Sequence, residues 1–319
     1  VTMKTDWFEL KEARLHLKPY TKGGFPIAVS SATTPSGVLT AGKYGVGMLS
    51  LGAGLPGGPQ KLAEQWKLGE EQAAKFGAEI VNDDVVSVDF TGDIKKVTVG
   101  RGETHEALAV IFATGSANRK LGLPSEDRLS GYGVSWCATC DGFFFRQKTI
   151  AVVGGGDSAM EEANFLTRFA DKVYVIHRFE TLRASKIMQE RALANPKIEF
   201  VWNAAITEIL GEAAVTGVTV TDTVTGATKD IALEGLFIAI GNDPRTHLIH
   251  GQIDLAPEGT IAVKARSSKT NLTGVFAAGD VVDPTYRQAV TAAASGTVAA
   301  LDAEHYLQSL PTETLAGAI

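Results

Sequence analysis

Cysteine is almost absent from this 319-residue chain: it occurs only at Cys137 and Cys140. No apolar run is long enough to span a bilayer, and residues 1–20 lack the apolar core of a signal peptide. A basic surplus is also missing, because 36 acidic residues outnumber 30 Lys and Arg, which gives a formal charge of −6. These absences argue against a membrane protein, a secreted protein and a nucleic-acid-binding protein. We therefore expect a cytoplasmic protein that binds small molecules or other proteins.

The overall composition is that of a globular protein, with 45% apolar and 21% charged residues. A chain of 319 residues exceeds the size at which a single hydrophobic core usually stops growing. Two domains are therefore the default expectation.

The two cysteines lie three positions apart in the stretch WCATCDG, residues 136–142. A structural disulfide is disfavoured in a reducing cytoplasm, and so short a ring would remove little entropy from the unfolded chain. A zinc site would need two more ligands, and the only suitably spaced pair, His247 and His250, lies more than a hundred residues downstream. A redox dithiol needs only two close cysteines, one of them made acidic by its surroundings. We therefore favour the redox interpretation and expect no metal.

Residues 148–178 predict a strand, a glycine turn, a helix and a second strand. The first strand, Thr149–Val153, is a short β-branched run, as expected of a strand buried on both faces. Gly154, Gly156 and Ala159 then give the spacing GxGxxA, which allows a tight turn, close approach of the backbone to a pyrophosphate, and close helix packing. The pattern predicts a dinucleotide site at the N-terminus of the helix.

The end of the second strand indicates which dinucleotide binds. An NAD site would place an acid there for the ribose hydroxyls, whereas this chain has His177 and Arg178, with Arg183 soon after. Guanidinium groups would hold a 2′-phosphate, so we predict NADPH in preference to NADH. The alternative is that these arginines only solvate the surface.

Two further strands are predicted downstream. Residues 235–244 predict a buried strand that runs into a turn, and residues 275–279 predict another strand, followed by Asp280. Asp280 could accept a hydrogen bond from a polyol hydroxyl or could simply cap a turn. From about Arg287 a helix rich in small residues is expected, which could lie close to a flat ligand or to a neighbouring helix.

Residues 75–307 resemble the bacterial low-molecular-weight thioredoxin reductases in the order and spacing of their motifs. The matching stretches are ATG at 113–115, CATCDGFFF at 137–145, GGGDSAMEEA at 154–163, HRFETLRASK at 177–186, GVFAAGD at 274–280 and YRQA at 286–289. The resemblance implies an α/β protein with two Rossmann-like nucleotide-binding domains, the NADPH domain being inserted into the FAD domain. It also implies boundaries at 1–116, 117–244 and 245–319, with joints near 116–119 and 242–246.

The function implied by the resemblance is that of a thioredoxin-disulfide reductase: NADPH reduces FAD, FAD reduces the disulfide, and the dithiol reduces thioredoxin. Cys137 and Cys140 would be the redox pair and Asp141 the proton donor and acceptor. Members of the family are usually homodimers. The residues expected to bind FAD or NADPH are Thr114, Gly115, Gly154, Gly156, Asp157, Ser158, Ala159, His177, Arg178, Arg183, Gly279, Asp280, Arg287, Gln288 and Ala289. Of these, Asp280 would bind the ribitol of FAD, and Arg287, Gln288 and Ala289 would lie along its isoalloxazine ring.

The residues around the cysteine pair agree with this implied role. Thiol–disulfide exchange requires proton movement, so a carboxylic acid beside the pair can act as general acid and base. Asp141 could equally cap a turn next to Gly142. Phe143, Phe144 and Phe145 are expected to be core residues.

Two departures from the family pattern stand out. Phe179 replaces a second arginine, so selectivity for NADPH over NADH is expected to be weaker. In addition, residues 1–74 lack the strand and GxGxxG turn for the FAD pyrophosphate, and part of them resembles a fragment of a luciferase-like flavin monooxygenase. We predict strands near 26–31 and 46–51 there, with helices near 36–45 and 59–76.

One stretch of this segment, GAGLPG, does match GxGxxG through Gly52, Gly54 and Gly57. Pro56 removes an N–H from the turn, however, and the expected acid would not end a strand, so we favour an ordinary connection. The alternatives to a working reductase are therefore a chain that binds NADPH but holds FAD poorly, and a related flavoprotein that reduces a different protein disulfide.

Overall fold

The computed structural model describes residues 77–311 without interruption, together with residues 3–4, 9–10, 28–31, 47–50, 67, 71 and 73–75. The chain forms two compact units, residues 1–52 with 57–80 and residues 53–56 with 81–319. Within the described parts, no helix combines the length and apolar character required to cross a membrane.

The first unit contains two pairs of short strands. These are β1 (Met3–Lys4) with β2 (Glu9–Leu10), antiparallel, and β3 (Ala28–Ser31) with β4 (Gly47–Ser50), parallel. The second pair confirms the two strands predicted for this segment. Of the helix predicted near 59–76, residues 67, 71 and 73–75 are helical. The helix predicted near 36–45 and the GAGLPG turn lie outside the described residues.

The second unit contains a five-stranded parallel sheet in the order β10-β17-β11-β12-β13. Its strands are β10 (Val134–Ser135), β11 (Thr149–Val153), β12 (Lys172–Ile176), β13 (Ile198–Val201) and β17 (Gly235–Ile238). The strands predicted at 149–153 and after residue 172 are confirmed. The buried strand expected at 235–244 ends at Ile238.

Alternate residues of β11 enter two different cores, because successive side chains of a strand point to opposite faces. Ile150 and Val152 pack with α5 (Asp157–Leu166), which contacts α6 (Lys186–Leu193). Ala151 and Val153 pack on the other face with residues of β14 and β15. This burial on both faces explains the unbroken apolar run of the strand.

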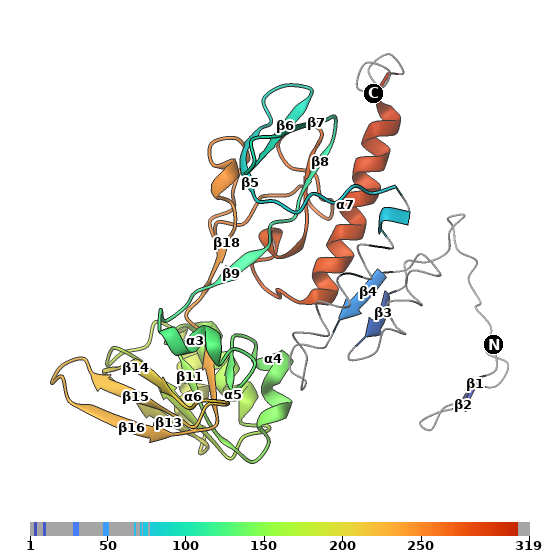
Figure 1. Ribbon diagram of the computed structural model, residues 1–319. Helices are drawn as coiled ribbons and strands as arrows, with labels where there is room; N and C mark the ends of the chain where they lie inside the picture. The colour runs from blue at the N-terminus through green and yellow to red at the C-terminus, as the bar shows by residue number, and fades with distance from the viewer. Residues whose placement is uncertain are drawn as a thin grey trace. The chain divides into compact units, whose positions relative to one another are not determined.

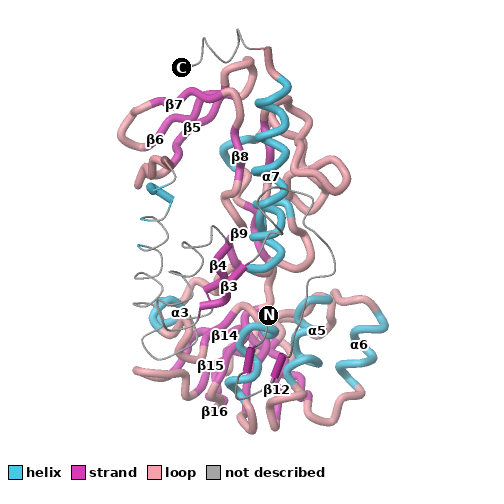
Figure 2. The backbone as a smooth tube through the Cα atoms, turned by 90° about the vertical axis from the view of Figure 1, so that its right-hand side faces the viewer, coloured by secondary structure: helices cyan, strands magenta, loops and turns pink. Residues whose placement is uncertain are grey.

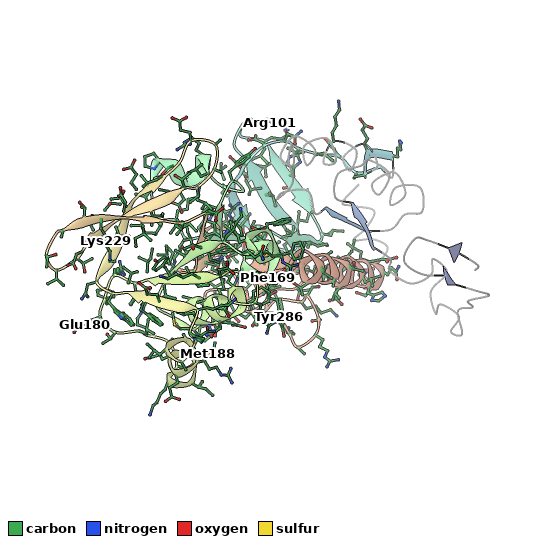
Figure 3. All side chains as sticks on the ribbon, turned by 90° about the horizontal axis from the view of Figure 1, so that it is seen from below. Arg101, Phe169, Glu180, Met188, Lys229 and Tyr286 are labelled. Atoms are coloured by element: carbon green, nitrogen blue, oxygen red, sulfur yellow. A yellow bond between two sulfur atoms is a disulfide. The ribbon has the colours of Figure 1, made fainter. Side chains whose placement is uncertain are left out.

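The layer on that second face is an antiparallel sheet of β14 (Ala204–Leu210), β15 (Gly217–Asp222) and β16 (Thr228–Ala232), which α3 (Pro124–Arg128) contacts through β14. β16 is an edge strand, and the exposed side chain of Lys229 lies on it (Figure 3). A lysine on an open edge discourages pairing with another chain.

The rest of the second unit is built from segments far apart in the sequence (Figure 1). It contains an antiparallel sheet of β5 (Val85–Asp89), β6 (Lys95–Val99) and β7 (Thr104–Ala107), the parallel pair β8 (Val110–Phe112) and β19 (Val275–Ala277), the 3-10 turns η2 (His247–Ile249) and η3 (Gly279–Val282), and α7 (Ala289–Ser309). Figure 2 shows α7 alongside β8, which it contacts. The strand expected at 275–279 therefore ends two residues early, because Gly279 starts a 3-10 turn.

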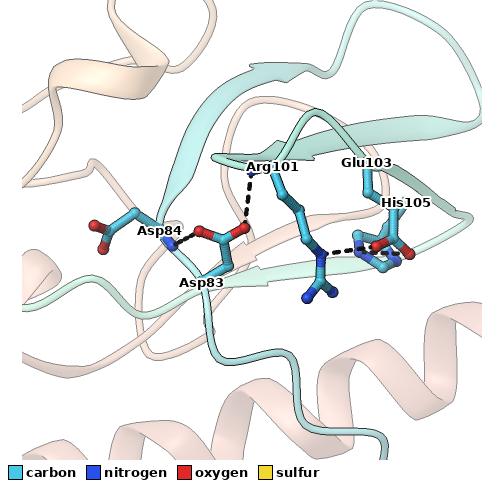
Figure 4. A network of polar contacts seen from close by, with 5 residues as sticks. All are labelled: Asp83, Asp84, Arg101, Glu103 and His105. Atoms are coloured by element: carbon cyan, nitrogen blue, oxygen red, sulfur yellow. Dashed lines mark hydrogen bonds and ion pairs between the residues drawn. The ribbon is translucent and has the colours of Figure 1, made fainter.

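The loop that leads into β5 is fixed by Asp83 (Figure 4). Its carboxylate accepts the backbone N–H of Asp84 at 2.8 Å and that of Arg101 at 3.0 Å, and these bonds, first the one from Arg101, lower the pKa of Asp83. Arg101 in turn donates to Glu103 at 3.0 Å. The network ties the entry of the β5-β6-β7 sheet to its β6–β7 turn.

The two segments expected to be interdomain joints pair with each other. β9 (Ser116–Asn118) and β18 (Asn242–Pro244) form an antiparallel ribbon, and Arg119 donates to Asp243 at 2.9 and 2.7 Å. The division of the chain at residues 116 and 244 remains a prediction. The pairing of β9 with β18 nevertheless gives a physical reason for placing the domain boundaries there.

Candidate active site

Cys137 and Cys140 form a disulfide at the start of a short helix. The helix, α4 (Ala138–Asp141), follows Cys137, whose sulfur accepts the backbone N–H of Cys140 at 3.2 Å and lies 3.3 Å from the Thr139 hydroxyl. Such donors stabilise a thiolate once the disulfide is reduced. Across the described residues, no group of three or more His, Cys, Asp or Glu side chains is arranged to hold a metal ion. The geometry suits a reducible pair.

Asp141, the predicted acid, is held by a buried serine. The hydroxyl of Ser135 donates to Asp141 Oδ2 at 2.7 Å, and its oxygen accepts the backbone N–H of Cys137 at 3.1 Å. Ser135 ends β10 and is only 4% exposed. The sequence did not single out Ser135, whose only signal was its position two residues before Cys137.

The prediction that Phe143, Phe144 and Phe145 are all core residues is wrong for the first two. Phe143 is 58% and Phe144 47% exposed, whereas Phe145 is 8% exposed. They lie in the 3-10 turn η1 (Gly142–Phe145), in which residues three apart share a face. Gly142 and Phe145 take the buried face, and the two residues between them are therefore left outside.

Gln288 brings the C-terminal part of the chain to the sulfur pair. Its Nε2 lies 3.8 Å from Cys137 Sγ and its Oε1 lies 3.9 Å from Cys140 Sγ. These residues line a cavity of about 1290 Å³, whose walls also include Ser158 and Asp280. The structure thus brings together residues that the sequence assigned separately to disulfide, nucleotide and flavin chemistry.

The loop before Gln288 is shaped by Asp283. Its carboxylate accepts the backbone N–H groups of Thr285, Tyr286 and Arg287, each at 2.8 Å. Burial opposes ionisation of Asp283, but these hydrogen bonds outweigh it and lower its pKa. They also hold Arg287 at a φ of +49°, a left-handed conformation that is costly for a residue with a side chain.

The other residues predicted to contact flavin follow β8 and β19. Because these strands are parallel neighbours, Thr114 and Gly115 lie at the same edge as Gly279 and Asp280. Gly115 and Gly279 both have a positive φ, and Gly279 donates its N–H to Ser295 at 2.9 Å. Burial, together with the charge of Asp283, raises the pKa of Asp280, and the charge of Arg287 partly opposes this. Ala289 begins α7 beside this edge.

The glycine turn has the shape that a pyrophosphate requires. Gly154 has a φ of +147°, and a Cβ there would clash with the Ala239 carbonyl and lie 2.8 Å from the Cβ of Ala159. A Cβ on Gly156, the N-cap of α5, would meet nothing within 4 Å. The first glycine and the alanine therefore serve packing, whereas the space next to Gly156 is open to a ligand.

The segment that carries Arg183 is tied to this turn. The backbone N–H groups of Arg183 and Ala184 donate to the carbonyl of Gly155 at 2.8 and 3.1 Å. Asp157 accepts the N–H and the hydroxyl of Ser185 at 2.7 and 2.8 Å, and these bonds, first the backbone one, lower its pKa. The glycine turn and residues 183–185 are more than twenty residues apart in sequence, and together they form one edge of the expected nucleotide site.

His177 packs against the glycine turn. The residue is 5% exposed, and its ring lies against Gly155 and has Nε2 3.1 Å from the Thr181 carbonyl. Burial lowers the pKa of His177, which favours the neutral ring. Arg178 is exposed, and its guanidinium lies 5.0 Å above the Phe179 ring. The contacts of His177 and Arg178 with a nucleotide remain predictions, and for His177 the burial indicates an indirect role.

Glu162 is a second residue that our sequence analysis missed. It lies on α5, lines the cavity, and its Oε2 is buried without a hydrogen-bond partner in the described structure. Burial, with a smaller effect of the neighbouring charge of Glu161, raises the pKa of Glu162 to about 7, and Arg287 opposes the shift. The only sequence signal was its place one turn after the glycine motif.

Comparison with known proteins shows the family of this chain. Residues 30–296 match the pyridine nucleotide-disulphide oxidoreductase family. A thioredoxin reductase of Streptomyces clavuligerus is 64% identical over 75% of this chain and 74% of its own length. The chain belongs to this family, and within it to the thioredoxin reductases. The family match includes residues 30–74, and the luciferase-like resemblance of that segment is therefore not supported.

Other thioredoxin reductases support the same assignment. The enzyme of Streptomyces coelicolor is 60% identical over 76% of this chain and 75% of its own length. A bifunctional thioredoxin reductase/thioredoxin of Mycobacterium leprae is 52% identical over 74% of this chain and 52% of its own length. The crystal structure of the Streptococcus pyogenes enzyme superposes with a TM-score of 0.73 at 36% identity, covering 89% of this chain and 98% of that one. The predicted α/β fold with two Rossmann-type nucleotide-binding domains is therefore confirmed.

Substitution of Gly156 tests the open space at the glycine turn. Gly156→Val is expected to weaken NADPH binding at least about tenfold, because the side chain would occupy the space left for a pyrophosphate. Its effect on the free energy of unfolding should be about 1 kcal/mol or less, since nothing lies within 4 Å of the new Cβ. Calorimetric NADPH titration and thermal unfolding measure the two effects. Gly92→Val, in the connection between β5 and β6, is the control. Unchanged NADPH affinity in Gly156→Val would refute the assignment.

The buried carboxyl of Glu162 should make stability depend on pH. Its pKa lies above the ordinary value of 4.5, so its stabilising contribution is fully present below pH 4.5 and is lost as pH rises through 7. The difference in the free energy of unfolding between Glu162→Gln and the wild type should therefore shift in favour of the variant by up to about 3 kcal/mol from pH 4.5 to pH 8. Urea unfolding at both pH values measures this difference. The exposed neighbour provides the control as Glu161→Gln, and an equal pH response in the two variants would contradict the role of burial.

Proposed function

We propose that this chain passes electrons from NADPH through FAD to the Cys137–Cys140 disulfide and from there to thioredoxin. The observation that carries the proposal is the contact of Gln288, on the predicted flavin-binding loop, with both sulfurs of the pair at 3.8 and 3.9 Å. The family assignment supplies the reaction class, and the geometry supplies residues for its parts. FAD, when bound, would relay two electrons from the nicotinamide to the disulfide.

The thiol chemistry can be assigned to atoms of this chain. Two electrons and two protons convert the Cys137–Cys140 disulfide into two thiols. One thiol then loses its proton and attacks a sulfur of oxidised thioredoxin, giving a mixed disulfide and a thioredoxin thiolate that takes up a proton. The second cysteine attacks the mixed disulfide, which restores the disulfide of this chain and releases reduced thioredoxin. We assign the acceptance and return of these protons to Asp141, which is the last residue of α4.

The described residues are suited to NADPH and to the flavin end of FAD. For NADPH, the glycine turn leaves room beside Gly156, and the edge carrying Arg178 and Arg183 offers cations for a 2′-phosphate. For the flavin, Asp280 and the loop around Arg287 line the same cavity as the disulfide. Residues 1–74, where the family resemblance would place the FAD pyrophosphate turn, lack that turn in sequence, and most of them lie outside the described residues.

The proposal also covers the protein substrate, the cellular location and the oligomeric state. Thioredoxin is the expected substrate, and the relative that combines both activities in one chain is consistent with this pairing. We also propose a cytoplasmic homodimer, by analogy with the bacterial thioredoxin reductases, to which the chain is similar. Nucleic acid and membrane are not expected partners.

The visible absorption spectrum of the purified protein, before and after FAD and then NADPH are added, tests the electron path. We expect a flavin spectrum that NADPH bleaches, and reduction of thioredoxin that depends on both cofactors. Cys140→Ser should abolish thioredoxin reduction and leave bleaching by NADPH intact, because its sulfur pair cannot close.

Two outcomes would contradict the electron path, and a third would contradict the identity of the substrate. Absence of flavin even with excess FAD would mean that the chain is a nucleotide-binding protein without its electron relay. Loss of bleaching in Cys140→Ser would mean that the cysteine is needed before the disulfide step. A bleached flavin with no thioredoxin reduction would point to another disulfide protein as the substrate.

Arg183 is expected to determine preference for the 2′-phosphate. Arg183→Ala should raise the KM for NADPH by about tenfold and leave that for NADH within about twofold, because only NADPH carries the additional charge. Steady-state kinetics with both nucleotides measure the ratio. Arg266→Ala, at an exposed arginine that does not line the cavity, is the control, and equal effects of Arg183→Ala on the two nucleotides would refute the assignment.

A further inference from the structure

Ser135 is the only side chain that joins the predicted acid to the backbone of the cysteine pair in the described structure. Its hydroxyl donates to Asp141 Oδ2 at 2.7 Å, and its oxygen accepts the N–H of Cys137 at 3.1 Å. A third contact, with the carbonyl of Cys137, is 3.5 Å long. A hydroxyl has one proton, and the shorter contact, to a carboxylate, is the stronger hydrogen bond. The proton of Ser135 is therefore committed to Asp141.

The position of this hydroxyl is set by the sheet. Ser135 is the last residue of β10, which pairs in parallel with β17, where Phe237 lies opposite it. The residue is 4% exposed, and the next residue, Trp136, packs against the core between the two sheets. Strand pairing and burial therefore fix the oxygen of Ser135 independently of the short helix α4. Asp141 and the sulfurs, by contrast, lie on a helix of a single turn.

We propose that Ser135 is a positioning residue for proton transfer between Asp141 and the cysteine pair. This inference rests on the proposed function, in which Asp141 takes and returns the thiol protons. Reduction breaks the S–S bond and allows the two sulfurs to separate. Ser135 keeps the carboxylate of Asp141 and the backbone of Cys137 at a fixed distance through that change. Without the hydroxyl, the half-buried carboxylate can turn to solvent, and the N–H of Cys137 loses its acceptor.

The proton balance of the step shows what the hydroxyl contributes. When a thiol of the pair attacks oxidised thioredoxin, its proton passes to the carboxylate of Asp141, one S–S bond forms and the S–S bond of thioredoxin breaks. The leaving thiolate then receives that proton. Ser135 keeps its own proton throughout and supplies only orientation. Its effect should therefore depend on the presence of a carboxylate at position 141.

The test compares two variants of equal shape, Ser135→Thr, which keeps the hydroxyl, and Ser135→Val, which replaces it with a methyl group. The full chain is reduced with dithiothreitol, freed of reductant and mixed with oxidised thioredoxin, and one turnover of exchange is followed without added NADPH. We expect Ser135→Val to slow exchange about tenfold or more and Ser135→Thr to slow it by less than about threefold. Equal rates in the two variants would overturn the proposal.

Combination with Asp141→Asn separates positioning from a general structural role. If Ser135 acts through Asp141, Ser135→Val should slow the Asp141→Asn variant by less than about twofold. An equal loss in both backgrounds would overturn the proposal and leave the proposed function intact. If Asp141→Asn does not slow exchange, the assigned role of Asp141 and the inference for Ser135 fail together. Failure of the wild type to reduce thioredoxin would instead defeat the proposed function.

A smaller substitution covers the case in which the β-branched variants do not fold. Ser135→Ala removes only the hydroxyl oxygen from a strand end and should keep the thermal unfolding transition. The same loss of about tenfold is expected, and again little further loss is expected together with Asp141→Asn. Full exchange by a folded Ser135→Ala variant would overturn the proposal.

Discussion

The site depends on one constraint, the burial of a parallel sheet on both faces. β11 sends Ile150 and Val152 into one core and Ala151 and Val153 into another, so neither face can carry polar chemistry. Every group that must meet water, a nucleotide or a partner protein is therefore displaced to the ends of the strands. In a parallel sheet, the carboxyl ends of neighbouring strands meet at a single edge.

That edge holds the parts of the site that belong to this sheet. β10 ends at Ser135 and leads to the cysteine pair, β11 ends in the glycine turn, and β12 ends before His177. β17, between β10 and β11, is followed by Ala239, whose carbonyl closes the space around Gly154. The disulfide and the nucleotide turn are therefore close because β10 and β11 are separated by only one strand. The strand order alone therefore accounts for their proximity.

Sequence patterns predicted the parts of this arrangement that depend on neighbours along the chain. The β-branched run of β11, the spacing of Gly154, Gly156 and Ala159, and the cysteine spacing are local features, and the structure places each as expected. The family resemblance supplied the two-domain fold. Phe143 and Phe144 were misjudged because hydrophobicity alone does not reveal a 3-10 turn, in which only one residue in three faces inward.

The roles that were missed depend on contacts between distant segments. Gln288 was predicted to contact the flavin, and what the sequence did not reveal is its contact with the sulfurs. Gln288 reaches the sulfurs across a separation of about 150 residues, and no periodicity encodes such a contact. Glu162 looks like a surface residue of an amphipathic helix until the cavity wall that covers it is known. Ser135 is close in sequence to the cysteines, yet its importance comes from the strand pairing with β17 that buries it. The sequence thus identifies the reacting groups, whereas the groups that orient them emerge only when the sheet is assembled, because orientation requires a support that does not move with the reacting atoms.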